Sequence, residues 1–563
     1  MRAATPEHRI AIRPPVWRKW RAFIAHARRM TIASFTDTLA DVYGERAAFI
    51  LDRPIESAVF SGSVVSYRDL QRLVCRAANA LAALGVRRGD RVALATANRI
   101  ELVFVELGAQ RLGAVPVPLN FMLTVDEIRD LVERSGARVL VTDRVVYERN
   151  IRDRAEVPSI DRWVMVTTQR VPDGFESLDT LMARASDSHV PADVRDDDPA
   201  LIFFTAGTTG QPKGALLTSG GLMASFRRYA AVAAVRPTPT RDLALAVMPL
   251  AHTGGHQQLM VHLALAIPSY VMGSFDPERI LDTIEAQRIT MFAGLPSMFR
   301  MLLDAGAAER DLRSVRVWGG GGDAFPRELI ARFRSLSPRS LFITGYGLAE
   351  TAGQVSIAPG FGAGDACVGW FLPGVDWRLL GADGRDVARG EPGELVLRTP
   401  GLMREYYGDP EATGAAIKDG WFHTGDLLRR GRWGMMYFVA REKEMIKVGG
   451  YSVFPAEVEK ALEAHPDVER CVIVGLPHRT KGELPVAAVV RRDGSDLSEE
   501  ALLAWAEARI AAYRCPRRVE LVDELPMSFA LKPLRSKVRA MLLAKGVTVQ
   551  ARSERMKSAS LTE

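Results

Sequence analysis

Apolar and polar residues alternate along much of the chain in a pattern that predicts strands followed by helices. Ser66 is placed to cap a helix, because the apolar residues of 70–84 recur at helical spacing up to Gly85. A helix is expected over residues 101–113, and strands are expected over residues 91–95, 114–120 and 138–143. Strands that alternate with helices in this way predict parallel sheets built from β-α-β units.

The rest of the chain continues this alternation and then changes character. Residues 240–345 repeat the pattern, residues 365–440 carry short strands and glycine turns, and a compact α/β segment follows residue 442. A chain of 563 residues is too long for one core and should divide into domains. We therefore expect an α/β protein with a large N-terminal domain of two α/β sheets plus a β-rich subdomain, and a small α/β C-terminal domain. The expected parts are a basic extension (1–29), an N-terminal domain (30–441), a C-terminal domain (442–545) and a tail (546–563).

The first 29 residues differ from the rest of the chain in charge. They hold eight lysines and arginines against one acid, and Trp17, Trp20, Phe23 and Ile24 fall on one helical face. A basic amphipathic helix with tryptophans is typical of contact with a membrane surface. Two other interpretations stay open: a disordered extension, or a chain that starts at Met30, where a first helix is expected to begin.

The composition excludes some classes of protein. Hydrophobic residues make up 47% of the chain and charged residues 25%, which are ordinary values for a globular protein. The net charge of +7 is small for this length, and the sequence has no nucleic-acid-binding motif, so we expect no nucleic-acid partner. The four cysteines are scattered without metal-site spacing, and the sequence has no secretory signal and no apolar run of membrane-spanning length. These features predict a cytoplasmic protein with reduced thiols.

A glycine- and threonine-rich stretch, "FFTAGTTGQPKGALLT" (203–218), lies between two apolar runs. Glycines let backbone amides approach an anion, threonine hydroxyls donate hydrogen bonds, and Lys213 supplies a mobile positive charge. The stretch is not a Walker A loop, because Pro212 stands where that motif has the glycine before its lysine. The alternative is a surface turn of small residues. We favour a phosphate-binding loop, whose candidate residues are Thr205, Gly207, Thr208, Thr209, Gly210 and Lys213.

Four later stretches add candidate chemistry. They are "GYGLAET" (345–351) with Glu350, "WFHTGDL" (421–427) with Asp426, "AREKEMIKVGGYSVFPAEVE" (440–459) with Arg441, and "LPMSFALKPLRSK" (525–537) with Lys532. Each alone is weak, because a carboxylate after a glycine turn is usually a cap and a late lysine is usually a surface charge. In this order and spacing they resemble the adenylate-forming superfamily of acyl-CoA synthetases, firefly luciferase and peptide-synthetase adenylation domains. The resemblance extends over about residues 30–545.

The resemblance implies a two-step reaction with ATP, Mg²⁺ and CoA. A carboxylate is a poor acylating agent, so ATP converts it to an acyl-adenylate with release of pyrophosphate, and the thiol of CoA then displaces AMP. The first step builds charge on phosphate oxygens, and its site must supply cations and positioning. The implied partners are a small carboxylic acid, ATP and CoA, and the sequence leaves open whether the chain forms a homo-oligomer.

The resemblance also implies which residues hold the nucleotide. The loop 205–213 would cradle the β- and γ-phosphates, and Glu350 would bind Mg²⁺, a hard cation that prefers oxygen ligands. Tyr346, which precedes Gly347 of the same motif, would stack on adenine. The backbone facing the base would be that of three residues, Gly321, Gly322 and Asp323. The ribose hydroxyls would be held by Asp426 and Arg441.

A second set of residues would act on the acid and the thiol. Lys532 would lie between the attacking carboxylate and the α-phosphate, whose mutual repulsion it offsets in the first step. His252 would lie beside the acyl pocket, with a packed core histidine as the alternative. The small C-terminal domain would be mobile and would rotate about Lys443 between the steps, unless that lysine is only a solvated charge. Gly449 and Gly450 would then face the CoA channel.

The chain departs from the family pattern at Ala206, Ala349 and Leu531, where serine, threonine and glycine are usual, and Pro533 follows the lysine. Each lost hydroxyl should cost about 1 kcal/mol, which weakens activity rather than abolishing it. The expected substrate is a medium- or long-chain fatty acid, because the glycines of "WGGGG" (318–322) would widen the acyl pocket while Trp318 limits its depth. Two alternatives stay open: a ligase that loads a carrier protein, and a degenerate homologue that binds nucleotide or acyl group without turnover.

Overall fold

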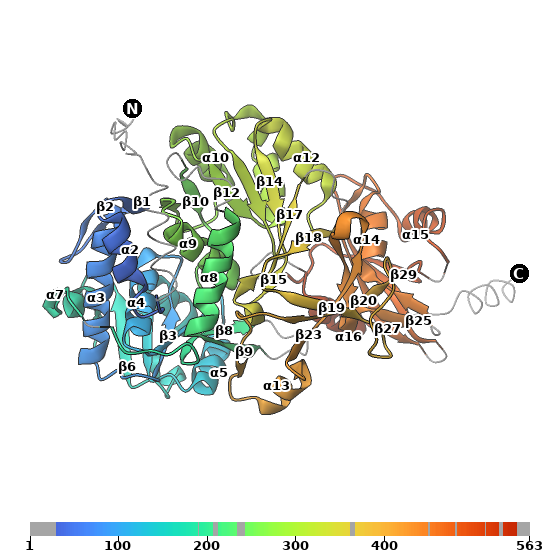
Figure 1. Cartoon of the computed structure of the whole chain (residues 1–563). Helices are drawn as coiled ribbons and strands as arrows, with labels where there is room; N and C mark the ends of the chain where they lie inside the picture. Colours follow the sequence, from blue (N-terminus) through green and yellow to red (C-terminus); the bar gives the residue numbers. More distant parts are fainter. Residues whose placement is uncertain are drawn as a thin grey trace, which may run out of the picture. The chain divides into compact units, whose positions relative to one another are not determined.

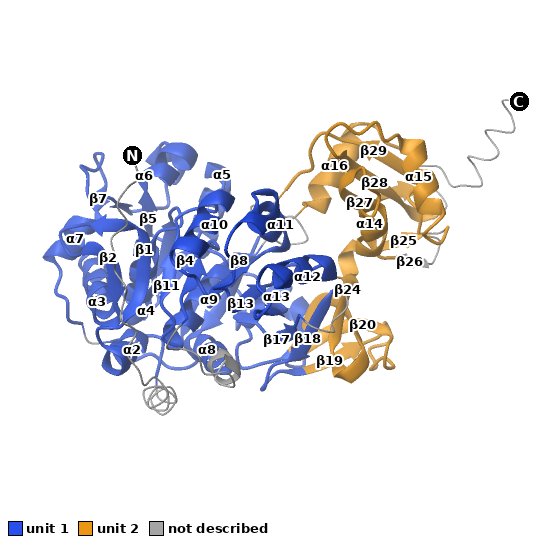
Figure 2. Cartoon of the chain, turned by 90° about the horizontal axis from the view of Figure 1, so that it is seen from above, with its two compact units in different colours: residues 1–207, 211–376, 398–422 blue, residues 208–210, 377–397, 423–563 orange. Residues whose placement is uncertain are grey.

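The computed structural model describes residues 30–189, 191–205, 212–233, 242–360, 366–448, 451–478, 481–512, 514–527 and 533–548. The chain divides into two compact units, which Figure 2 colours separately. One unit comprises residues 1–207, 211–376 and 398–422, and the other comprises residues 208–210, 377–397 and 423–563. Both units combine helices with sheets (Figure 1), so the expected α/β class is confirmed.

A parallel sheet in the first unit carries the expected β-α-β alternation. Its strands follow the order β4-β3-β5-β6-β7 and pair in parallel throughout. They are β3 (Arg91–Ala95), β4 (Val115–Pro118), β5 (Val139–Asp143), β6 (Arg162–Val166) and β7 (Glu176–Ser177). The helices of this region are α3 (Tyr67–Ala83), α4 (Ile100–Arg111), α5 (Val125–Ser135), α6 (Arg144–Val146) and α7 (Leu178–Arg184). Ser66 caps α3 as expected: its hydroxyl accepts from the Asp69 backbone, and the Asp69 carboxylate accepts from the Ser66 backbone.

A second, mixed sheet of the same unit follows the order β2-β1-β11-β10-β12-β13-β14-β17-β18. It is parallel from β1 to β14 and antiparallel at its two ends. Its strands are β1 (Ala47–Glu56), β2 (Ser61–Ser66), β10 (Ala244–Ala246), β11 (Ser269–Val271), β12 (Met291–Gly294), β13 (Val317–Gly320), β14 (Leu341–Thr344), β17 (Ser356–Pro359) and β18 (Cys367–Phe371). The helices of this region are α9 (Thr253–Ala264), α10 (Pro277–Ala286), α11 (Pro296–Asp304) and α12 (Arg327–Leu336).

An aromatic core packs on β13 of this sheet. Trp318 is completely buried and meets the rings of Phe292, Phe299 and Phe333 edge to face, with centroid distances of 6.0, 5.9 and 5.0 Å. The indole therefore exposes no surface that could line an acyl pocket, and the prediction that Trp318 limits the depth of that pocket is wrong. The cause is the strand geometry, since successive side chains point to opposite faces of a sheet and this one points into the core.

A small antiparallel sheet, in the order β21-β9-β8, flanks the predicted phosphate loop. Its strands are β8 (Pro199–Thr205), β9 (Lys213–Thr218) and β21 (Glu405–Tyr406), so the two apolar runs around the loop are strands. Helix α8 (Ser219–Ala233) follows β9 directly. Nearby short elements are β15 (Gly347–Leu348), the 3₁₀ helix η4 (Ala349–Thr351), β16 (Gly353–Gln354), α13 (Pro410–Ala416) and β22 (Ile417–Lys418).

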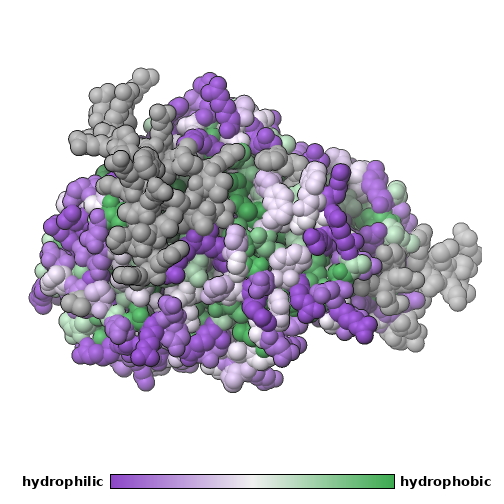
Figure 3. Space-filling view, viewed as in Figure 1, coloured by the Kyte–Doolittle hydropathy of each residue, from purple (hydrophilic) through white to green (hydrophobic). Residues whose placement is uncertain are grey.

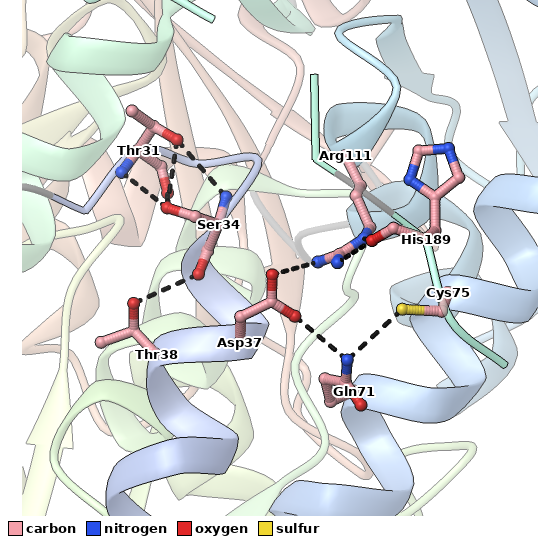
Figure 4. A network of polar contacts seen from close by, with 8 residues as sticks. All are labelled: Thr31, Ser34, Asp37, Thr38, Gln71, Cys75, Arg111 and His189. Atoms are coloured by element: carbon pink, nitrogen blue, oxygen red, sulfur yellow. Dashed lines mark hydrogen bonds and ion pairs between the residues drawn. The ribbon is translucent and has the colours of Figure 1, made fainter. Parts of the chain in front are cut away.

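The first helix of the described chain, α2 (Phe35–Tyr43), is fixed by a polar network (Figure 4). Asp37 accepts hydrogen bonds from Arg111 at 2.8 Å and from the Gln71 amide at 3.1 Å. Gln71 also donates to the Cys75 sulfur at 3.5 Å, and Arg111 donates to the His189 carbonyl. Desolvation raises the pKa of the Cys75 thiol, which therefore stays protonated at neutral pH. The network joins α2 to α3 and α4.

The second unit contains a β-rich part and a C-terminal lobe, by which we mean its described residues from 446 to 548. The β-rich part follows the order β19-β20-β23-β24. Its strands are β19 (Asp376–Leu380), β20 (Pro392–Arg398), β23 (Trp421–Arg430) and β24 (Met436–Arg441). The lobe sheet follows the order β26-β25-β28-β27, with β29 paired to β28. Its strands are β25 (Ile446–Val448), β26 (Tyr451–Val453), β27 (Val468–His478), β28 (Gly482–Arg491) and β29 (Arg518–Leu521).

Two apolar cores cover the faces of the lobe sheet. Helices α14 (Pro455–Glu463) and α15 (Glu499–Glu507) pack with one set of strand residues, represented by Ile473 and Val489. Helix α16 (Arg535–Ala544) packs with the alternate set, represented by Val472 and Val486. Alternate residues of a strand point to opposite faces, so the lobe is a sheet between helices.

On the face seen in Figure 3, most of the coloured surface is hydrophilic and smaller hydrophobic areas lie between the hydrophilic residues, which is ordinary for a globular protein. Within the described residues, no helix combines the length and the apolar character needed to cross a bilayer. The expected amphipathic helix of residues 1–29 and most of the expected tail lie outside the described residues.

Candidate active site

The two ends of the predicted phosphate loop are held together by strand pairing. Thr205 ends β8, Lys213 begins β9, and the two residues are partners in the antiparallel register. The Thr205 hydroxyl donates a hydrogen bond to the Lys213 carbonyl at 3.3 Å. The two ends of the loop are therefore adjacent, as a loop that closes around an anion requires. The other candidate residues of the loop lie outside the described residues: Gly207, Thr208, Thr209 and Gly210, with the neighbouring Ala206.

Glu350, the predicted Mg²⁺ ligand, is joined to Lys213 by a tyrosine that lies outside the sequence motifs. Tyr406 donates a hydrogen bond from its hydroxyl to Glu350 Oε1 at 2.8 Å. The Lys213 ammonium lies 5.0 Å from the centre of the Tyr406 ring, within the range of a cation–π contact. Tyr406 reaches this place because it pairs with Ala215 of β9. The structure therefore brings a lysine, a tyrosine and a carboxylate together beside the predicted phosphate loop.

Two helices fix the turn that carries Glu350. Ala352, which follows η4, has a positive φ of 52°, a conformation that few residues other than glycine adopt. The Ser225 hydroxyl of α8 donates to the Ala352 carbonyl at 2.9 Å. Gln257 of α9 donates to the Ser225 hydroxyl at 3.1 Å and accepts from the Gln354 backbone at 2.8 Å. These bonds set the direction in which the carboxylate leaves the turn.

The residues predicted to contact adenine follow two neighbouring parallel strands. Gly320 of β13 pairs with Thr344 of β14, so the segments 321–323 and 345–347 both leave the carboxyl edge of the sheet. A Cβ atom on Gly321 would lie 3.2 Å from the Gly345 carbonyl oxygen, so the two segments touch. Ligands of open α/β sheets bind at this edge. The structure thus places Gly321, Gly322 and Asp323 beside the segment that holds Tyr346 and Gly347.

His252 caps the helix that supports the Glu350 turn. It precedes α9, and its Nδ1 accepts a hydrogen bond from the Gly254 backbone at 3.2 Å. The side chain is exposed, yet desolvation by the surrounding protein lowers the pKa of its imidazole. Exposure and desolvation are compatible when protein atoms surround most of the imidazole ring and one face stays open to solvent. The lowered pKa keeps the ring neutral at neutral pH. Its exposure argues against a packed core histidine, and its place beside an acyl pocket stays a prediction.

A buried acid–histidine pair that is not among the predicted site residues lies one turn further along α9. Nε2 of His256 lies 2.6 Å from Oε1 of Glu106 in α4, and both side chains are buried. The His256 ring packs edge to face against Phe203 of β8, with a centroid distance of 5.3 Å. The pair therefore links α4 and α9 to the strand that leads into the phosphate loop. The sequence signal is a glutamate in the middle of a largely apolar helix, which does not identify a partner 150 positions away.

The second unit brings together the two residues predicted to bind ribose. Asp426 of β23 and Arg441 of β24 are register partners in an antiparallel pair. Nε of Arg441 lies 3.2 Å from Oδ1 of Asp426, whose side chain is only 2% exposed. The backbone amide of Gly425, where φ is +66°, donates to Glu394 at 3.2 Å and fixes the strand just before the aspartate. The Asp426 carboxylate is thus an acceptor with a fixed direction, suited to a sugar diol.

The predicted pivot follows this pair. Lys443 is exposed and lies in the 3₁₀ turn η6 (Glu442–Glu444), directly after β24. The predicted CoA-channel glycines and the predicted catalytic lysine with its neighbour lie outside the described residues: Gly449, Gly450, Leu531 and Lys532.

The residues around Glu350 fit a magnesium ion that has few protein ligands. Mg²⁺ usually keeps several waters and binds one or two carboxylates together with substrate phosphates. Glu350 supplies one oriented carboxylate beside the loop predicted to hold those phosphates. Among the residues that the structure describes, no three His, Cys, Asp or Glu side chains gather as a self-sufficient metal site. A bound ion would neutralise charge on the phosphates, and Glu350 would hold it there.

Proteins of known function with similar sequences point to one family. The family model described as AMP-binding enzyme matches residues 38–407, and the AMP-binding enzyme C-terminal domain matches residues 457–529. Feruloyl-CoA synthase from Amycolatopsis sp is 35% identical over 85% of this chain and 94% of that protein. 4-Coumarate–CoA ligase 2 from Oryza sativa subsp. japonica is 32% identical over 89% and 91% of the two chains. Long-chain-fatty-acid–CoA ligase from Escherichia coli O157:H7 is 29% identical over 89% and 94%.

A solved structure of similar fold points the same way. ATP-bound MatB from Rhodopseudomonas palustris has a TM-score of 0.80 to this structure and 28% sequence identity, over 91% of this chain and 99% of that one. The expected architecture, a large sheet-rich N-terminal domain followed by a smaller C-terminal domain, is therefore confirmed.

Proposed function

The chain belongs to the AMP-binding enzyme family, and from this premise we propose the reaction and the substrate that its site serves. It is an AMP-forming acid–CoA ligase that uses ATP, Mg²⁺ and CoA. The acid and ATP form an acyl-adenylate and pyrophosphate, and the CoA thiol then takes the acyl group with release of AMP. The observation that carries the proposal is the meeting of Lys213 and Glu350 at Tyr406, beside the ends of a glycine-rich loop.

This meeting suits the departure of pyrophosphate in the first step. Lys213 and the amides of the loop would neutralise the β- and γ-phosphates, and Glu350 would hold a Mg²⁺ ion that supplies further positive charge there. The Tyr406 hydroxyl donates to one oxygen of Glu350 and so holds the carboxylate in one direction. The hydroxyl of Thr351, two residues after Ala349, donates a hydrogen bond to the Gly353 carbonyl at 2.6 Å. It therefore does not replace the hydroxyl donor of the threonine that is usual at position 349.

We propose that the acid is aromatic, whereas the glycines of residues 318–322 predicted a fatty acid. Two of the glycines used for that expectation leave no open space. A Cβ atom on Gly319 would lie 3.0 Å from the Ala293 Cβ, and one on Gly320 would lie 2.2 Å from the Phe325 ring. These glycines serve packing, so they do not argue for a wide pocket. Identity is also higher to the feruloyl and coumarate ligases, at 35% and 32%, than to the long-chain fatty-acid ligase, at 29%.

An acid panel tests the proposed substrate. Ferulate, 4-coumarate and indoleacetate are compared with octanoate and palmitate, each with ATP and Mg²⁺, with and without CoA. Pyrophosphate release and thioester formation are measured separately. We expect kcat/KM for at least one aromatic acid to exceed that for both fatty acids by about tenfold, the discrimination that small differences in pocket contacts provide. A preference for palmitate or octanoate would contradict the aromatic substrate.

The same panel separates the two remaining alternatives. Pyrophosphate release without a thioester to CoA would favour a ligase that loads a carrier protein. No release with any acid would favour a homologue without turnover, as the departures Ala206, Ala349 and Leu531 allow. Contact of residues 1–29 with a membrane surface, a cytoplasmic location and the formation of a homo-oligomer stay predictions.

A further inference from the structure

The side chain of Arg535 joins the turn at the predicted hinge to the body of the C-terminal lobe. Its Nε donates to Glu444 at 3.1 Å, and its terminal nitrogens donate to both carboxylate oxygens of Glu459, one of them at 2.7 Å. One terminal nitrogen also donates to the Ile473 carbonyl at 2.9 Å. The donors of a guanidinium lie in one rigid plane, so the fork on Glu459 fixes the direction in which Nε meets Glu444.

Glu459, the partner of Arg535 within the lobe, is itself held by a further hydrogen bond. Glu459 of α14 also accepts a hydrogen bond from the Ile473 backbone at 2.7 Å, so the fork joins α14, β27 and α16. The side chains of Glu459 and Arg535 are 13% and 24% exposed. Desolvation opposes the charge on Arg535, yet the hydrogen bonds and charges of Glu459 and Glu444 raise its pKa above the ordinary value. Glu444, at the outer end, is the partner that can be changed without dismantling the lobe.

The residues of the turn differ in how they are held. Glu442 and Lys443 are exposed, and within the described part of the chain neither side chain forms a hydrogen bond or an ion pair. Glu444, the next residue, is half-buried and bound to Arg535. A hinge works because a few residues absorb a large change of φ and ψ, and tied side chains resist such a change. The turn therefore passes from two unrestrained residues to one that belongs to the lobe.

We propose that Arg535 is a positioning residue that fixes Glu444 to the C-terminal lobe and so confines hinge bending to Glu442 and Lys443. This proposal rests on the proposed two-step reaction and on the rotation of the lobe about Lys443 between the steps, which the family resemblance implies. A hinge of two residues allows the lobe fewer orientations than a longer hinge would. A larger fraction of those orientations is therefore productive. Loss of the tie should slow turnover without weakening ATP binding, because Asp426 and Arg441 precede the turn.

The test compares three variants of the full chain: Glu444→Gln, Arg535→Lys and Arg539→Lys. Lysine keeps the charge of arginine and loses the planar fork. Arg539 is a matched control, because it lies on the same helix, α16, and makes similar contacts away from the turn. It donates to the Gly475 carbonyl at 2.8 Å and to Glu483 at 3.2 Å.

We expect Glu444→Gln and Arg535→Lys to speed hydrogen exchange of the backbone amides in residues 442–446 and to lower kcat. Each change should be about tenfold, the effect of losing one hydrogen bond to a charged group. The KM for ATP should not change, and Arg539→Lys should alter neither exchange in the turn nor kcat. Exchange is followed by mass spectrometry, and kcat by acyl-CoA formation.

Several outcomes would overturn the proposal. One is a rate of hydrogen exchange in residues 442–446 that stays at the wild-type value in both Glu444→Gln and Arg535→Lys. Another is a rise of that exchange rate in Arg539→Lys that equals the rise in the other two variants. If Arg535→Lys has a lower melting temperature but the wild-type kcat at temperatures where it is folded, Arg535 only stabilises the fold. If the wild-type chain releases no pyrophosphate with any acid, the proposed function fails instead, and the exchange comparison still decides whether the tie exists.

Discussion

The Lys532→Ala variant should form acyl-adenylate about a hundredfold to a thousandfold more slowly than the wild type, the usual cost of removing one charge-stabilising group. It should keep its ability to form acyl-CoA from supplied acyl-adenylate. In the first step the carboxylate approaches the α-phosphate, and the two anions repel each other unless a cation lies between them. In the second step a thiol attacks an uncharged carbonyl, which does not need that cation. The two half-reactions are measured separately, by pyrophosphate release and by thioester formation.

Lys537→Ala is the control for this variant. Lys537 is an exposed lysine of α16, in the same part of the chain and with the same charge. Its removal should leave both half-reactions unchanged. An equal loss of both half-reactions in a folded Lys532→Ala protein would contradict the assignment of this lysine to the first step.

The Asp426→Ala variant should raise the KM for ATP roughly tenfold to a hundredfold, because hydrogen bonds to a charged group are worth about 1.5–3 kcal/mol. The Asp426 side chain is 2% exposed and lies 3.2 Å from Nε of Arg441. The substitution removes the acceptor proposed for the ribose diol and leaves Arg441 without that carboxylate. The affinity for the acid, measured at saturating ATP, should change much less.

Asp386→Ala separates this effect from the general loss of an acid. Asp386 lies in the same β-rich part and pairs with Arg378 at 3.0 and 3.1 Å, but its side chain is 62% exposed. Exposed ion pairs contribute little, so the KM for ATP should stay at the wild-type value. If Asp426→Ala is folded and its KM for ATP is also that of the wild type, the ribose is held elsewhere.

The elements that flank the site are predictable from local patterns. The apolar runs around the glycine-rich loop are strands β8 and β9, and the helix capped by Ser66 begins at Tyr67. Local patterns are less reliable at the start of the described chain. The helix expected at Met30 begins at Phe35, because the backbone of Thr31 donates to the Ser34 hydroxyl at 3.1 Å and holds a turn there.

The contacts that complete the site are not predictable from one sequence, because they join residues far apart in the chain. Tyr406 reaches Glu350 across 56 positions, and Arg535 reaches Glu444 across 91. Periodicity identifies a buried face and a charge, but it does not identify the partner. Trp318 illustrates a related limit, since a short apolar strand does not reveal which face of the sheet each side chain covers.

Transfer of oxygen from the acid to AMP tests the proposed reaction most directly. The wild-type chain is supplied with ATP, Mg²⁺, CoA and an acid of the panel whose two carboxylate oxygens are ¹⁸O, and the products are analysed by mass spectrometry. If an acyl-adenylate forms, one carboxylate oxygen stays on phosphorus when the thiol displaces AMP. The account therefore predicts one ¹⁸O in each AMP, one in each acyl-CoA and none in pyrophosphate. Acyl-CoA formed together with unlabelled AMP, or with ADP and labelled phosphate, would contradict it.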